Sequence, residues 1–161
     1  MSETLQGELL YAYVAGIVDG EGSIIIYHRK PGPSPVSQKH GKYYSMTVQI
    51  GTTDEWLPLF LKINFPQSYI YGPYKSKTLL NSKPSWRWQI VCGHAAIFLE
   101  SILPYLQIKK QQAELALRFQ SRRSNSKRHG RNGKWAPNNE KAILDEADKI
   151  LMNTYNKRGL K

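Results

Sequence analysis

Two acidic residues near the N-terminus have the side chains and the spacing for metal-dependent chemistry. Asp19 and Glu21 alternate with glycines at the end of an apolar segment, in the sequence VAGIVDGEG of residues 14–22. Carboxylate oxygens are preferred ligands of hard divalent cations such as Mg²⁺, and such a cation promotes phosphodiester hydrolysis. Glu21 is therefore the candidate catalytic carboxylate and metal ligand, with the Gly20 carbonyl as a second candidate ligand.

The apolar segment before these acids predicts a helix over about residues 7–19. Ala12, Gly16 and Gly20 recur four residues apart, so they share one helical face that a second helix can approach closely. One carboxylate and one carbonyl make a sparse cation site, and the motif occurs once in the chain. We therefore expect a homodimer with Ala12, Gly16 and Asp19 at its interface; capping a turn is the other role open to Asp19.

The motif of residues 14–22 resembles the signature of the LAGLIDADG homing endonucleases, with Val14 in place of the usual first Leu. A second segment, LPYLQIKKQQA at residues 103–113, is similar to another stretch of single-motif members of that family. The resemblance covers about residues 7–120. It implies that Glu21 is the catalytic acid and that Lys109 is an active-site lysine. It also implies a polar residue that positions water, for which Gln49 and Thr52 compete.

This resemblance implies a site-specific endonuclease that cuts both strands of a long, roughly palindromic double-stranded DNA. The implied cofactor is Mg²⁺, with Mn²⁺ or Ca²⁺ as substitutes for binding, and the implied role is intron or intein mobility. Two alternatives share the same fold. One is a maturase that binds RNA and assists splicing, and the other is a DNA-binding protein that has lost cleavage.

Composition fits a small protein with a polyanionic partner. The chain has 161 residues, with 23 Lys and Arg against 12 Asp and Glu, for a net charge of +11. We expect one domain over residues 1–161, with a core at about 7–120 and a basic loop and helix at about 121–161. A charge that improves solubility, or a ribosome-associated protein, is the plainer explanation.

Cysteine usage and hydropathy bear on the compartment. The single Cys92 excludes an intramolecular disulfide, and the chain shows neither a secretory signal nor 18 consecutive apolar residues. We therefore expect no membrane partner and an intracellular protein, in the cytoplasm of a prokaryote or in the matrix of a mitochondrion or chloroplast.

Hydrophobic patterning predicts an α+β fold of order αββαββα with extra C-terminal helices. The predicted strands, at about residues 23–29, 44–50, 68–74 and 85–92, would form a four-stranded antiparallel sheet with helices on one face. No acid occurs between Glu21 and Asp54 or between Glu55 and Glu100, so the other face suits a phosphate backbone. The residues predicted to bind DNA are Ser23, Ile25, Tyr27, Arg29, Lys30, Lys42, Ser45, Thr47, Gln49, Tyr71, Lys75, Arg87 and Gln89.

Two further features have a simple and a functional interpretation. The basic segment 118–134 is either a loop that lies on phosphates or a solvated loop. Trp86 and Trp88 are either core residues or rings that stack on nucleobases, and strand spacing favours the core.

Overall fold

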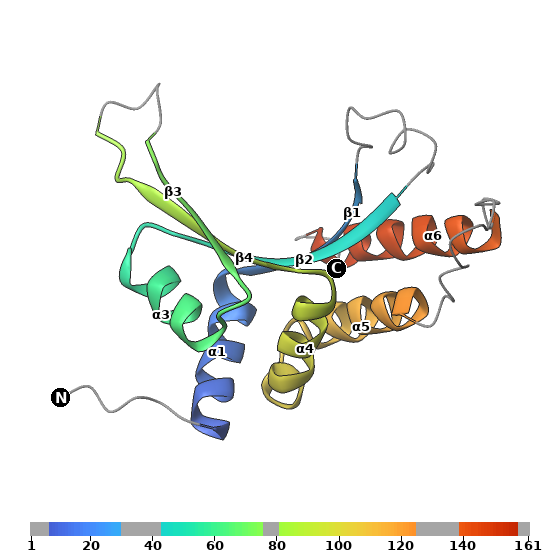
Figure 1. The fold of residues 1–161 in the computed structure, drawn as a ribbon, viewed down its shortest axis with the longest axis horizontal. Helices are drawn as coiled ribbons and strands as arrows, with labels where there is room; N and C mark the ends of the chain where they lie inside the picture. The colour runs from blue at the N-terminus through green and yellow to red at the C-terminus, as the bar shows by residue number, and fades with distance from the viewer. Residues whose placement is uncertain (1–6, 30–42, 76–80, 125–138, 158–161) are drawn as a thin grey trace, which may run out of the picture.

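The computed structural model describes residues 7–29, 43–75, 81–124 and 139–157. Its elements follow the predicted α+β order (Figure 1). They are α1 (Glu8–Glu21), β1 (Gly22–Arg29), β2 (Tyr43–Thr52), α3 (Trp56–Asn64), β3 (Tyr69–Tyr74), β4 (Ser85–Val91), α4 (Cys92–Ile102), the 3-10 turn η1 (Leu103–Tyr105), α5 (Lys110–Ser124) and α6 (Asn139–Asn156). None of the described helices is long and apolar enough to cross a membrane.

The four strands form one antiparallel sheet in the order β1-β2-β4-β3. The sheet is strongly curved, and its concave face carries no helix (Figure 1). Helices α1, α3, α4 and α5 lie on the convex side, and α6 contacts β1. One face of the sheet is therefore covered by helices, as the alternating sequence pattern predicts, while the other is left open.

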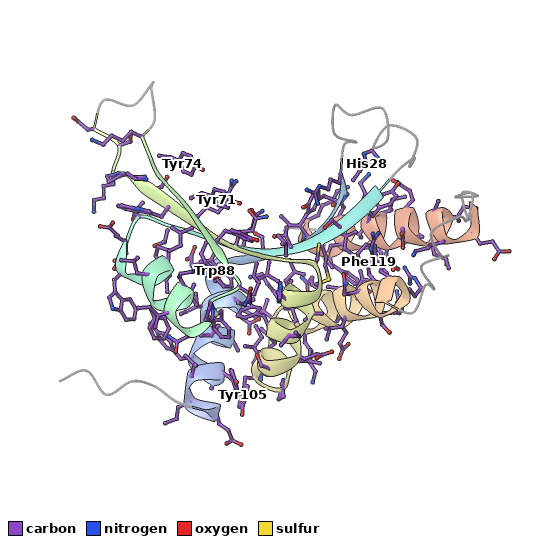
Figure 2. All side chains as sticks on the ribbon, viewed as in Figure 1. His28, Tyr71, Tyr74, Trp88, Tyr105 and Phe119 are labelled. Carbon is purple, nitrogen blue, oxygen red and sulfur yellow. The ribbon has the colours of Figure 1, made fainter. Side chains whose placement is uncertain are left out.

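The core lies between the convex face and the helices. Alternate residues of β1 and β2 point into it, and Ile24, Met46, Val48 and Ile50 are all fully buried. Trp88 of β4 is also fully buried, and its indole N–H donates a hydrogen bond of 2.7 Å to the Ser68 hydroxyl (Figure 2). This burial confirms Trp88 as a core residue. The Ser68 hydroxyl supplies the partner that the single polar group of a buried indole requires.

Helix α6 packs against the β1–β2 pair and contacts the end of this pair that lies away from α1. Tyr44 is buried there and donates a hydrogen bond to Glu146, and the ring of His28 meets it edge-on at 5.4 Å. Burial, followed by the neighbouring Glu146, raises the pKa of Tyr44 to about 12. At the C-terminal end of α6, the side-chain amide of Asn156 donates a hydrogen bond of 2.8 Å to the Ile24 carbonyl.

The basic segment 118–134 differs from the predicted loop in its described part. Arg118 and Arg122 belong to α5, and α6 turns Asp145 and Asp148 inward to face them. Arg118 pairs with Asp148 at 3.2 Å, and Arg122 pairs with Asp145 at 3.4 Å and with Asp148. The described part of this segment is therefore helical and not a loop, and both guanidinium groups have acidic partners on α6. Residues 125–134 lie outside the described part.

Loss of one buried carboxylate of this ion-pair group should weaken the α5–α6 contact. Asp148→Ala removes the acid shared by Arg118 and Arg122, and we expect it to lower the free energy of unfolding by about 1–3 kcal/mol. Glu114→Ala, which removes an exposed acid of α5, is the control and should change stability by less than about 0.5 kcal/mol. Urea unfolding of both variants is the measurement, and equal losses would contradict a structural role for the pair.

Candidate functional site

The site is built at the C-terminal end of α1. This helix extends to Glu21, so Gly20 and Glu21 belong to its last turn and not to a turn after it. Strand β1 begins directly at Gly22, where an added Cβ would lie 2.7 Å from the Val18 carbonyl oxygen. Only glycine fits this change from helix to strand. The abrupt junction leaves the Glu21 side chain exposed at the edge of the sheet.

Asp19 and Lys109 hold this helix end in place. The Asp19 carboxylate accepts hydrogen bonds of 2.8 Å from the backbone N–H groups of Gln107 and Lys109. In return, the Lys109 ammonium donates to the carbonyls of Val18, at 2.8 Å, and Asp19, at 2.5 Å. Carbonyls at a helix C-terminus lack helical partners and favour a cation. The carboxylate of Asp19 therefore acts within the chain, which is the second of its two predicted roles.

Lys109 is placed differently from a lysine that reaches a substrate. Its side chain is buried, with 8% of the residue exposed, and its ammonium faces the backbone of α1. The active-site role of Lys109 stays a prediction, and in this structure its contacts position the turn that carries Glu21.

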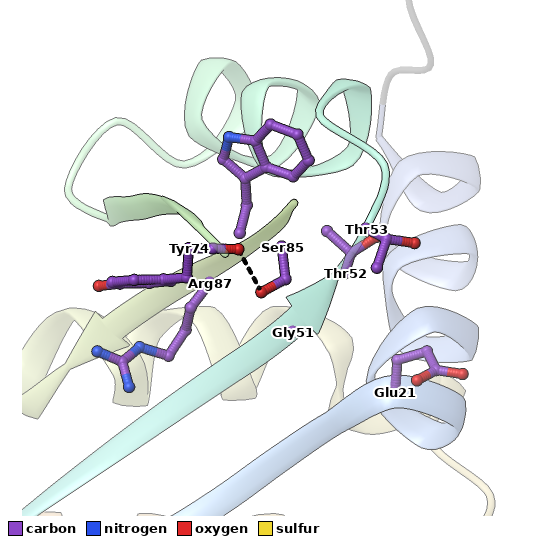
Figure 3. Close-up of a pocket in the computed structure, with 8 residues that line it drawn as sticks. Glu21, Gly51, Thr52, Thr53, Tyr74, Ser85 and Arg87 are labelled. Carbon is purple, nitrogen blue, oxygen red and sulfur yellow. Dashed lines mark hydrogen bonds between the residues drawn. The ribbon is translucent and has the colours of Figure 1, made fainter. Parts of the chain in front are cut away.

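A hollow of about 690 Å³ opens beside Glu21. Figure 3 shows Glu21 on one side and Arg87 on the other, with Gly51 and Thr52 between them. The full lining is Glu21, Gly51, Thr52, Thr53, Tyr74, Ser85, Trp86 and Arg87. Thus the hollow joins the end of α1 to the ends of β2, β3 and β4.

The two candidates for the water-positioning residue are separated by the fold. Thr52 lines the hollow with Glu21, and its hydroxyl accepts a hydrogen bond of 3.0 Å from the Asp54 backbone N–H. Gln49 does not line the hollow. It lies on the concave face, where it pairs with Ser23 on β1 and Gln89 on β4. The structure therefore brings Thr52 to Glu21.

Several residues of the hollow were not identified from the sequence. Gly51 lies opposite Arg87 because β2 pairs with β4, and Tyr74 lies opposite Ser85 because β3 pairs with β4. The β2–β4 pairing joins strands that are not consecutive, so no local pattern reveals it. The only sequence signal was that Tyr74 and Ser85 flank the second hairpin loop.

Two of the predicted DNA-binding residues are not exposed. Ser45 and Thr47 are on the concave face, yet only 2% and 4% of their surfaces are accessible. The Thr47 hydroxyl donates a hydrogen bond of 3.0 Å to the Ile90 carbonyl, and Ser45 contacts the Cys92 sulfur at 3.1 Å. Their strand alternation was predicted correctly, but both side chains pack against neighbouring groups of β4 and α4. Their predicted exposure was wrong.

The remaining predicted DNA-binding residues form a polar concave face. Ser23, Arg29, Tyr71, Lys75 and Arg87 are exposed. The partly buried residues are Ile25, Tyr27, Gln49 and Gln89. Lys30 and Lys42 lie outside the described residues. None of the four strands contains Asp or Glu, so this face presents no carboxylate of its own to a phosphate backbone.

The donor set at Glu21 fits one half of a cation site. No group of three or more His, Cys, Asp or Glu side chains gathers anywhere in the described part of the chain. Glu21 forms no ion pair with a described basic residue, and the Gly20 carbonyl lies in the same final turn. A carboxylate and a carbonyl suit Mg²⁺ when other oxygen donors complete its shell.

Neither a family model nor a curated protein matches the chain, but solved structures do. The homing endonuclease I-CvuI in complex with DNA superposes with a TM-score of 0.70 at 16% identity, over 96% of this chain and 86% of that one. The archaeal intron-encoded homing endonuclease I-Vdi141I with DNA gives 0.68 at 11% identity, over 94% and 87%. The LAGLIDADG homing endonuclease I-SmaMI gives 0.57 at 18%, over 96% of this chain and 46% of its own. The chain has the LAGLIDADG endonuclease fold. At these identities the similarity establishes the fold alone.

Within this fold the end of α1 should depend on Lys109. Lys109→Met removes two hydrogen bonds to helix-end carbonyls, so we expect the free energy of unfolding to fall by about 1.5–3 kcal/mol. Lys110→Met changes the adjacent exposed lysine and should have little effect. Thermal unfolding followed by circular dichroism distinguishes them, and a Lys109→Met variant as stable as Lys110→Met would exclude this positioning role.

Proposed function

We propose that this chain is a site-specific double-stranded DNA endonuclease that acts as a homodimer and serves intron or intein mobility. The observation that carries the proposal is the exposed Glu21 carboxylate, held at the end of α1 beside an acid-free concave sheet. The fold neighbours I-CvuI and I-Vdi141I, both homing endonucleases in complex with DNA, support it.

The concave face is suited to the major groove. Its exposed side chains are polar or basic, and β-strands enter this groove in several classes of DNA-binding protein. The net charge of +11 adds affinity that does not depend on base sequence. The concave curvature of the sheet suits a surface that follows a duplex (Figure 1).

The proposed dimer contact begins with α1. Ala12, Gly16 and Gly20 are exposed, and a Cβ added to either glycine would meet no atom within 4 Å. Nothing else in the described chain covers this stripe of small residues. A two-fold axis along it would bring two α1 helices into close contact and set two Glu21 side chains side by side.

Helix α3 extends this apolar surface. Tyr13 of α1 meets Phe60 edge-on at 5.7 Å, and Phe60 stacks on Trp56 at 4.9 Å. Trp56 is 56% exposed and Ile63 is 75% exposed, which is costly unless another surface covers them. The chain also spans about half of I-SmaMI, as expected if two copies were to do the work of one longer chain.

In the proposed reaction, the two Glu21 carboxylates would hold divalent cations between the subunits, next to the scissile phosphates. A bound Mg²⁺ supplies charge relief at phosphorus and an activated water. Lys109 and Asp19 hold the end of α1 that carries Glu21, and Thr52 offers a hydroxyl in the same hollow. The I-CvuI complexes were determined with 2 mM Mg or 2 mM Ca, which supports a divalent cation; Mn²⁺ would also bind oxygen donors of this type.

Neutralising the proposed metal ligand should separate cleavage from binding. Glu21→Gln keeps the side-chain shape but weakens cation binding, so Mg²⁺-dependent cleavage should fall at least ~100-fold while DNA affinity persists. Glu8→Gln, which changes an exposed acid at the other end of α1, is the matched control. The assay is cleavage of a plasmid library that carries randomised palindromic sites. DNA binding without cleavage by the unmodified chain would favour the cleavage-inactive alternative, and preference for RNA would favour the maturase.

The small-residue stripe should control the oligomeric state. A Cβ at Gly16 would meet no neighbouring atom within 4 Å, and Gly16→Leu improves helix propensity by roughly 1 kcal/mol, so the subunit should remain folded. A leucine there would block close approach of a second α1, and we expect sedimentation velocity to show monomers. Gly93→Leu, at an equally open position on α4, is the control and should remain dimeric. If Gly16→Leu remains dimeric, the two α1 helices do not meet as proposed.

A further inference from the structure

Arg87 has an unusual setting for an exposed arginine. It lies on β4 in the row nearest the Glu21 hollow, and it also lines that hollow. Among the described residues it forms no ion pair, although its guanidinium carries five N–H donors. Those donors therefore face solvent on the concave side of the sheet, next to the candidate cleavage site.

The two cross-strand neighbours of Arg87 have different effects. One restrains its guanidinium group, and the other leaves space beside it. On one side Tyr71 of β3 is directly opposite, and the guanidinium carbon lies 5.2 Å from the centre of the Tyr71 ring. On the other side Gly51 of β2 has no side chain, and nothing lies within 4 Å of where its Cβ would be. Stacking on an aromatic ring restrains the planar fork of an arginine without using its N–H groups.

A restrained guanidinium fork with free donors matches one base in particular. Guanine presents two acceptors, O6 and N7, to the major groove, and a bidentate arginine is the commonest specific contact to them. We infer that Arg87, held by Tyr71, reads a guanine in each half of the target, among the base pairs nearest the cut. This inference rests on the proposed endonuclease function, which supplies the duplex.

The next row of the sheet predicts the spacing between two recognised base pairs. Gln89 follows Arg87 on the same face of β4 and lies opposite Gln49 of β2. Residues two apart on a strand are separated by about 6.8 Å, and base pairs by about 3.4 Å. An amide pairs in bidentate fashion with adenine N6 and N7. The two rows therefore read positions about two base pairs apart, with the guanine nearer to Glu21.

The experiment is selection of bound duplexes from a library of randomised palindromic DNA, with Ca²⁺ in place of Mg²⁺ and recovery by sequencing. The full chain is compared with Arg87→Lys, Arg87→Ala, Tyr71→Ala and Gln89→Ala, each checked for folding by circular dichroism and for affinity to the selected duplex by titration. Arg87→Lys keeps the charge but loses the fork. We expect it to weaken the preference for guanine at one position about ten-fold, with the other positions unchanged. Tyr71→Ala should weaken the same preference, and Gln89→Ala should relax a different position about two base pairs away.

The outcomes separate this inference from the proposed function. If the chain selects a defined sequence but Arg87→Lys leaves every base preference intact, Arg87 reads no base. If Arg87→Lys and Arg87→Ala both weaken all sequences equally, Arg87 contacts a phosphate, and the inference fails in that case too. If the unmodified chain selects no duplex sequence at all, the proposed function fails together with it.

Discussion

The site depends on the reciprocal bonds between the end of α1 and the turn before α5. Asp19 satisfies two backbone N–H groups of that turn, and Lys109 satisfies two carbonyls of α1. Lys109 brings a cation to the carbonyl end of α1, and Asp19 pairs N–H groups just before α5, so the two segments stabilise one another. These bonds link residues 88–91 positions apart along the chain. They hold the end of α1, which carries Glu21, against the turn before α5.

The distribution of charge follows from the same division between helices and sheet. The four strands contain no acid, and two acids of α6, Asp145 and Asp148, are turned inward onto the arginines of α5. The strands therefore bring no carboxylate to the concave face, where it would repel a phosphate backbone, and three arginines of α5 have acidic partners on α6. The positive charge that remains unpaired on the sheet is concentrated in a few residues, of which Arg87 lies nearest to Glu21.

Much of the fold could be predicted because its signals are local. Helical spacing located α1, and strict alternation in β2 assigned Met46, Val48 and Ile50 to the core, where they are buried. Alternation assigns a face but not its exposure, so it failed for Ser45 and Thr47, which are buried against Cys92 and the Ile90 carbonyl. Composition predicted a loop at Arg118 and Arg122, which belong to a helix, because a basic run does not reveal acids that face it from a helix about 25 residues later.

The sequence by itself determined the order of the elements, the absence of acid from the sheet and the placing of Glu21 at the end of a small-residue helix. These features are fixed by residues close together in the chain. The tertiary structure decided the rest: that Lys109 faces the carbonyls of α1, that Thr52 and not Gln49 shares the hollow with Glu21, and that Tyr71 and Gly51 flank Arg87. The physical reason is that each of these contacts depends on strand order or helix docking, which arise from burial over the whole core and leave no local trace.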